Sequence, residues 1–125
     1  MSAALDRSPT IDLEVFEGLR DEFGIEVLLG LAGTFCERAP LVNELVVASR
    51  GDDGRAVARL GHRLHDAASI LAATRLAELC LELEAFGEAG NVEEAAGVAE
   101  RIATEYVRAV AVMSEHLRAP RGTRH

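Results

Sequence analysis

Apolar residues recur at alternating intervals of three and four along the last quarter of the chain. The positions are Val92, Ala95, Ala99, Ile102, Tyr106, Ala109, Met113 and Leu117. This spacing draws one apolar stripe along a helix of more than three heptads, and such a stripe is stable in water only when other helices cover it. The pattern therefore predicts a bundle of helices.

The rest of the chain carries the same period in shorter segments. Further helices are expected at about 12–23, 25–39, 41–49, 54–73 and 75–86. The breaks between them are Gly24, Pro40, the turn from Gly51 to Gly54, and the glycines at 87 and 90, all of which are typical helix terminators. No segment alternates with the period of a strand. We therefore predict an all-α protein, an antiparallel up-down four-helix bundle with an additional short N-terminal helix.

Size and composition favour one domain. The chain has 125 residues, of which 49% are hydrophobic, and this suffices for one core of ordinary size. We expect a flexible N-terminal arm at 1–10, the bundle at 11–118 and a disordered tail at 119–125 after the last helix. Two cysteines, Cys36 and Cys80, fall in apolar helical patterns without metal-type spacing, and we expect both to be buried as small hydrophobic residues.

The charge balance argues against several partners. The formal net charge is −8, which repels phosphate backbones and anionic lipids, so neither nucleic acid nor a membrane is expected as a partner. The chain shows no signal-peptide pattern and no long apolar run, and we expect a cytoplasmic protein. Acidic residues of the last helix are expected on its polar side, where they serve solubility: Glu93, Glu94, Glu100 and Glu105.

One histidine lies on the wrong face of its helix for a core residue. At about 100° per residue, His62 lies nearly opposite the apolar stripe of the 54–73 helix and is expected to point into solvent. The outer face that it shares also carries Arg55, Arg59, Asp66 and Ser69. On geometry alone, a surface histidine without a function is an equally good interpretation.

The residues around His62 distinguish these interpretations. The segment Gly61-His62-Arg63-Leu64-His65-Asp66-Ala67-Ala68 is followed at set distances by Leu76, Leu79, Cys80, Leu83 and Glu84. This sequence resembles the histidine phosphotransfer (HPt) family, in which a small residue precedes the histidine and a Leu-x-x-Leu-Cys-x-x-Leu-Glu helix follows. Family-like stretches at 11–14, 35–40 and 51–52 extend the resemblance to nearly residues 11 to 117.

The resemblance implies a phosphoryl carrier without kinase activity of its own and without a cofactor. His62 would accept a phosphoryl group from an aspartyl phosphate and pass it on. An unprotonated imidazole nitrogen is a competent nucleophile near neutral pH and needs no separate base. The implied partners are a response-regulator receiver domain and a hybrid sensor kinase. Docking would use the exposed face of the 54–73 helix: Arg59 and Arg63 as phosphate or receiver contacts, and Ala58, Gly61 and Ser69 as small exposed residues that permit close approach.

Two residues depart from the family pattern. The usual Lys three residues after the histidine is His65, which can hold phosphoryl oxygens only as a hydrogen-bond donor or when protonated. The usual Gly is Asp66, whose charge either opposes a phosphoryl group on His62 or orients the imidazole. Two alternatives follow: a degenerate bundle that docks a receiver or kinase without carrying phosphate, and a divalent metal site formed by His62, His65 and Asp66. We expect no metal.

Overall fold

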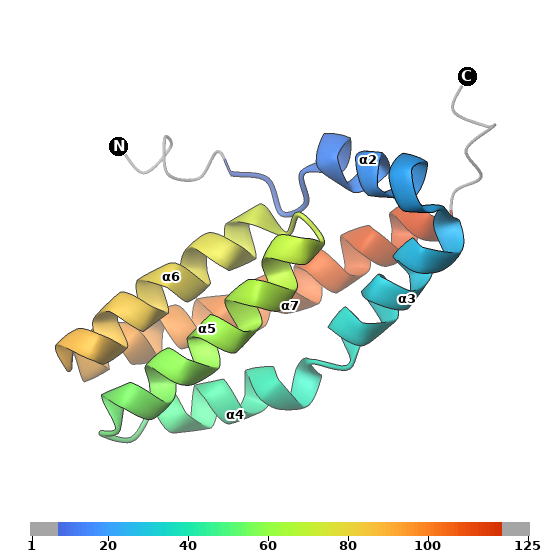
Figure 1. Ribbon diagram of the computed structural model, residues 1–125. Helices are drawn as coiled ribbons and strands as arrows, with labels where there is room; N and C mark the ends of the chain where they lie inside the picture. The colour runs from blue at the N-terminus through green and yellow to red at the C-terminus, as the bar shows by residue number, and fades with distance from the viewer. Residues whose placement is uncertain (1–7, 119–125) are drawn as a thin grey trace.

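Six helices account for nearly all of residues 8–118, the part of the chain that the computed structural model describes (Figure 1). They are α2 (Leu13–Phe23), α3 (Ile25–Cys36), α4 (Ala39–Ser49), α5 (Gly54–Ile70), α6 (Thr74–Ala89) and α7 (Val92–Arg118). No strand occurs in this range, so the all-α prediction is confirmed. Most of the expected arm at 1–10 and the whole expected tail lie outside the described residues. Residues 8 and 9 lie against α6, where the Ser8 hydroxyl donates to Glu78 and the Pro9 carbonyl accepts from the Arg75 amide.

The four helices α4 to α7 form the predicted bundle. Each packs against two of the others, in the cyclic order α4, α5, α6, α7 (Figure 1). The long helix α7 extends beyond this group, and its far half is covered by α3, on which α2 packs. The largest fully buried apolar side chains come from all six helices: Phe16, Leu28, Phe35, Leu45, Leu64, Leu71, Leu76, Leu83, Ile102 and Met113. Their burial, about 1.5–3 kcal/mol each, holds the six helices together.

Capping residues fix where the helices begin. The Asp12 carboxylate accepts from the Val15 amide at the start of α2, and the Asp53 carboxylate accepts from the Ala56 amide at the start of α5. Pro40 lies in the first turn of α4, where its missing N–H costs no hydrogen bond, and the chain turns just before it, at residues 37 and 38.

Several helix boundaries differ from the predicted ones. The break expected at Pro40 lies instead at residues 37 and 38, so that α3 ends at Cys36 rather than near 39 and α4 begins at Ala39 rather than 41. Helix α5 ends at Ile70 rather than near 73, because Ala72 adopts a left-handed φ of 60°. Glycine is the usual residue in this conformation, so the sequence did not indicate the helix end. Helix α6 continues through Gly87 and ends at Gly90, whose φ of 77° makes it the C-cap. Gly87 is buried inside the helix and faces Gly54 of α5, so that the two backbones are in direct contact.

The expected exposure was wrong for Cys36 and for Glu105. Cys36 is exposed, because the last turn of α3 packs on the bundle through Phe35, which is fully buried, and the Cys36 side chain lies outside that contact, whereas Cys80 is buried as expected. Glu105 is only 2% exposed and not on the polar side of the last helix. It lies at the edge of the apolar stripe, where Arg108 donates to its Oε1 at 2.8 Å and the Arg75 Nε lies 4.0 Å away. These cations compensate the desolvation of a buried carboxylate.

Within residues 8–118, no helix combines the length and the hydropathy needed to cross a bilayer.

Candidate functional site

His62 projects from the middle of α5 into solvent. Its side chain is 62% exposed, while Leu64, two residues further along the same helix, is fully buried. The predicted outward direction is therefore confirmed. Arg59, Arg63, Asp66 and Ser69 are also exposed on α5, as expected.

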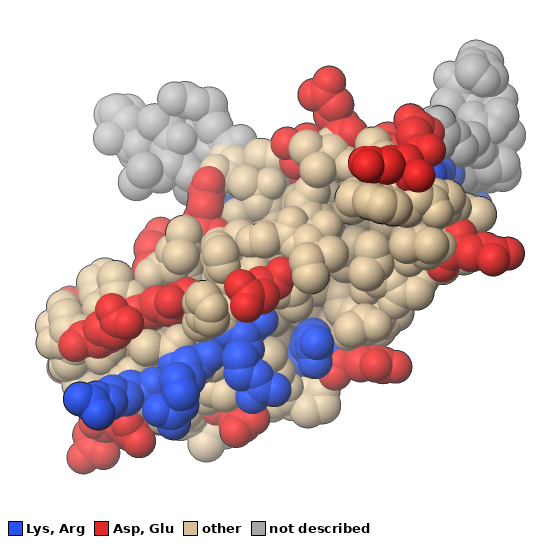
Figure 2. Space-filling model, viewed as in Figure 1, with Lys and Arg blue, Asp and Glu red and all other residues tan. Residues whose placement is uncertain are grey.

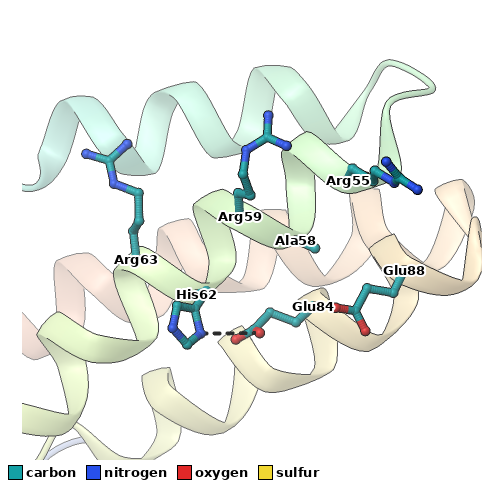
Figure 3. Close-up of a pocket in the computed structure, with 7 residues that line it drawn as sticks. All are labelled: Arg55, Ala58, Arg59, His62, Arg63, Glu84 and Glu88. Carbon is teal, nitrogen blue, oxygen red and sulfur yellow. Dashed lines mark ion pairs between the residues drawn. The ribbon is translucent and has the colours of Figure 1, made fainter.

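A carboxylate from the neighbouring helix approaches the ring of His62. Oε1 of Glu84, on α6, lies 3.5 Å from Nδ1 of His62, an ion-pair contact when the ring is protonated (Figure 3). The Glu84 side chain is 19% exposed, and among the described residues its Oε2 has no hydrogen-bond partner. The sequence showed Glu84 only as the end of a family-like pattern, and the role of this residue as a neighbour of His62 was missed. The fixed distance between the two residues in that pattern was the available signal.

A second carboxylate lies on the other side of the ring. Asp66 is one turn along α5 from His62, and its Oδ2 lies 3.6 Å from Nε2. Its side chain is 64% exposed and therefore has room to change rotamer. The imidazole thus lies between two carboxylates, one half-buried beside Nδ1 and one exposed beside Nε2.

The side chain of His65 is less exposed than those of His62 and Asp66. Its side chain is 25% exposed, its Nδ1 lies 3.7 Å from Asp66, and its Nε2 is within 3.4 Å of the Ser69 hydroxyl. The ring centroids of His62 and His65 are 6.3 Å apart. His65 is thus close enough to influence the site, but both of its nitrogens face side chains of α5.

Ala58 and Gly61 do not form an exposed small-residue surface. Both are buried, because α6 packs over them. A Cβ on Gly61 would lie 3.3 Å from side-chain atoms of Leu83 and Glu84 and 3.4 Å from the Cys80 carbonyl. The small size of Gly61 therefore serves the approach of α6, which brings Glu84 to His62, and not the approach of a partner. Ala58 forms part of the floor of the hollow beside His62.

An open hollow of about 710 Å³ lies between α5 and α6 (Figure 3). Its lining residues are Arg55, Ala58, Arg59, His62, Arg63, Glu84 and Glu88. In Figure 3 the guanidinium groups of Arg59 and Arg63 extend away from the His62 ring, on the side opposite Glu84. The two arginines therefore flank the histidine and do not cover it.

The described residues do not form a metal site. Nowhere between residues 8 and 118 are three His, Cys, Asp or Glu side chains grouped so that they could hold a metal ion, and this includes His62, His65 and Asp66. Burial, together with the charge of Glu84, raises the pKa of the Cys80 thiol to about 12. This thiol stays protonated near neutral pH and is neither a nucleophile nor a metal ligand.

Comparison with known families agrees with this geometry. The family model for the Hpt domain matches residues 30–112, which include the four-helix bundle up to the last turns of α7 and the whole hollow around His62. The match is shorter than the resemblance expected over 11 to 117. Neither a curated protein nor a solved structure matched the chain. Hpt domains transfer phosphoryl groups in two-component systems and interact there with receiver domains. Because the match covers about two thirds of the sequence, the chain belongs to the Hpt domain family.

Proposed function

We propose that this protein is a phosphoryl carrier in which His62 receives a phosphoryl group from the aspartyl phosphate of one receiver domain and passes it to the aspartate of another. The observation that carries the proposal is the pairing of an exposed imidazole with a half-buried carboxylate from a different helix. A solvated surface histidine needs no such partner. A nucleophile does, because its ring must be oriented and its tautomer selected.

We infer that Glu84 selects which nitrogen reacts, because Glu84 is half-buried, whereas Asp66, at a similar distance from Nε2, is exposed and more strongly screened by solvent. A neutral imidazole carries one N–H, and a carboxylate near Nδ1 favours the tautomer with the proton on Nδ1. The lone pair is then on Nε2, the nitrogen beside the exposed Asp66. Nε2 attacks the phosphorus, the bond between phosphorus and the aspartate oxygen breaks, and the aspartate leaves as a carboxylate. The phosphorylated ring keeps its proton on Nδ1, and the negative charge of Glu84 stabilises the resulting cation.

Asp66 opposes this step in the conformation described here. Its carboxylate lies 3.6 Å from Nε2, in the region that a phosphoryl group must enter, and like charges at that distance repel. The side chain is exposed and can rotate away, but the charge remains one turn from the reaction. We infer that Asp66 slows phosphorylation or restricts it to receivers with a compensating cation.

The position of Asp66 beside Nε2 favours one alternative, a bundle that binds a receiver or a sensor kinase without carrying phosphate. In that case Asp66 marks a site that has kept its docking face and lost its reactivity. Glu84 argues for the carrier, because docking alone does not require an oriented imidazole.

The test is phosphoryl transfer from a panel of phosphorylated receiver domains to the purified protein. The wild type should take up an acid-labile, base-stable label, and His62→Gln should take up none while its circular dichroism spectrum and Tm stay unchanged, since an exposed side chain contributes little to stability. His116→Gln is the matched control, because His116 lies at the contact between α2 and α7 and contacts Glu17 there. Label on His62→Gln would refute the assignment. A wild type that binds a receiver but takes up no label would establish the alternative.

Two further variants separate the roles of the carboxylates. Glu84→Gln should lower the rate of transfer by about tenfold, the lower end of the effect seen when a supporting carboxylate is removed. Asp66→Gly should raise the rate of phosphoryl transfer if the carboxylate repels the incoming phosphoryl group. A slower Asp66→Gly variant would show instead that Asp66 orients the ring.

A further inference from the structure

The charges around the hollow are separated by sign. Arg55, Arg59 and Arg63 project from α5, whereas Glu84 and Glu88 project from α6. Figure 2 shows the same division as a row of blue groups along α5 that runs beside a row of red groups along α6. His62 lies on the boundary between the two rows.

The three arginines of this row make no ion pair with any residue between 8 and 118. Arg50 pairs with Glu100 and Arg108 with Glu105, whereas Arg38 and Arg101, like the arginines of the row, have no ion pair among the described residues. The distinguishing feature of the row is that it places three such cations beside His62. The row also carries a cost, because like charges four residues apart on a helix repel. The protein has 21 acidic residues and a net charge of −8, so acceptors for these cations are plentiful, yet none of the described ones is within ion-pair distance.

We propose that the hollow is an orientation-selective docking site for a receiver domain that carries an acidic patch next to a basic patch. The acidic patch faces the arginines of α5, the basic patch faces the glutamates of α6, and the reacting aspartate meets His62 between them. This inference rests on the proposed function. A partner turned by half a revolution about His62 would bring like charges together, and such juxtaposition excludes the wrong orientation.

A model in which the arginines attract any acidic partner makes the opposite prediction for Glu88. If the arginines merely attract an acidic partner, every carboxylate in the hollow weakens the attraction, and Glu88→Arg should accelerate binding. If the division of charge selects the orientation, Glu88→Arg removes one of the two glutamates of the hollow and should slow binding although the net charge becomes less negative. Glu88 is suited to this test because it is exposed and one turn from Glu84.

The experiment measures association rate constants for the receiver domains that bind the wild type, at low and high salt. Glu88→Arg should associate about fivefold more slowly at low ionic strength, and the difference should disappear near 1 M salt, where the Debye length is about 3 Å. Arg59→Glu should show a similar loss. Glu94→Arg is the matched control: it makes the same change in net charge on an exposed position of α7 outside the hollow, and its rate should equal or slightly exceed that of the wild type.

Different results would refute the orientation-selective site and the carrier function on which it rests. A Glu88→Arg variant that binds as fast as the wild type, or faster, overturns the orientation-selective site. Labelling of His62 by a small phosphoryl donor such as phosphoramidate needs no docking and reports the reactivity of the wild-type histidine alone. Absence of that label in the wild type, together with absence of transfer from every receiver, would refute the carrier function itself.

Discussion

Replacing Gly87 with alanine tests the close contact that positions the two helices of the site. The backbones of α5 and α6 meet where Gly87 faces Gly54. A Cβ on Gly87 would lie 2.7 Å from the Gly54 carbonyl oxygen and 3.2 Å from the Ala58 amide nitrogen. Because these are backbone atoms, no side-chain rotation relieves the overlap, and α6 must move away from α5 by about 0.7 Å to restore ordinary contact at 3.4 Å.

The magnitude follows from two opposing terms. Overpacking of a well-packed core costs about 1–3 kcal/mol, and we expect the upper end here because both contacting atoms belong to helix backbones. Alanine gains up to about 1 kcal/mol over glycine within a helix. The free energy of unfolding of Gly87→Ala should therefore fall by about 2 kcal/mol. The shift of α6 should also move Glu84 away from His62 and slow phosphoryl transfer.

Urea unfolding followed by circular dichroism measures the effect. With an m value of about 2 kcal/mol/M, the midpoint should fall by about 1 M. Gly97→Ala is the matched control, because Gly97 lies within α7 and a Cβ there would meet no described atom within 4 Å beyond its own helix. That variant should gain up to about 1 kcal/mol. If Gly87→Ala were as stable as the wild type while Gly97→Ala shows its gain, the argument from backbone contact would be refuted.

Three further predictions concern stability and thiol chemistry. Burial, the main cause, and the nearby Cys36 raise the pKa of Tyr106 from 10.0 to about 12, so the native state keeps a proton that the unfolded state loses. The free energy of unfolding should therefore fall by up to about 1.4 kcal/mol per pH unit between pH 10 and 12. In Tyr106→Phe, the free energy of unfolding should fall less steeply with pH over the same range. Ala72→Gly should raise the free energy of unfolding by about 0.5–1 kcal/mol, because glycine tolerates the left-handed φ of 60°; an unchanged or lower urea midpoint would contradict this. A thiol reagent should modify Cys36 in the native protein and Cys80 only after unfolding, since Cys36 is exposed and Cys80 is buried and protonated; rapid modification of both thiols would show that the core opens at α6.

Periodicity predicted the direction of His62 because a helix of 3.6 residues per turn relates every side chain to the apolar stripe of its own helix. It could not place Ala58 and Gly61. Both lie at the margin of the stripe, where burial depends on which neighbour packs there, and α6 packs over them. Their small size was expected to permit the approach of a receiver domain, but it permits the approach of another helix of the same chain.

The burial of Glu105, a charged residue, could not be predicted from periodicity either. Its position next to Tyr106 leaves it at the edge of the stripe, so the sequence is compatible with either side. Arg75, thirty residues earlier, approaches it from α6, and Arg108 pairs with it within α7. A contact between helices thus buries a residue that composition alone assigns to the surface.

The sequence by itself determined that this chain is a helical bundle, where most of its helices begin and end, and that His62 points outward, because each of these depends on local periodicity, capping and turn residues. The meeting of His62 with Glu84, the separation of positive and negative charge across the hollow and the burial of Glu105 were decided only by the tertiary structure. These features depend on how α5, α6 and α7 pack and on their register, and that register is set by the close contact of Gly54 with Gly87 and by the apolar side chains buried between the helices.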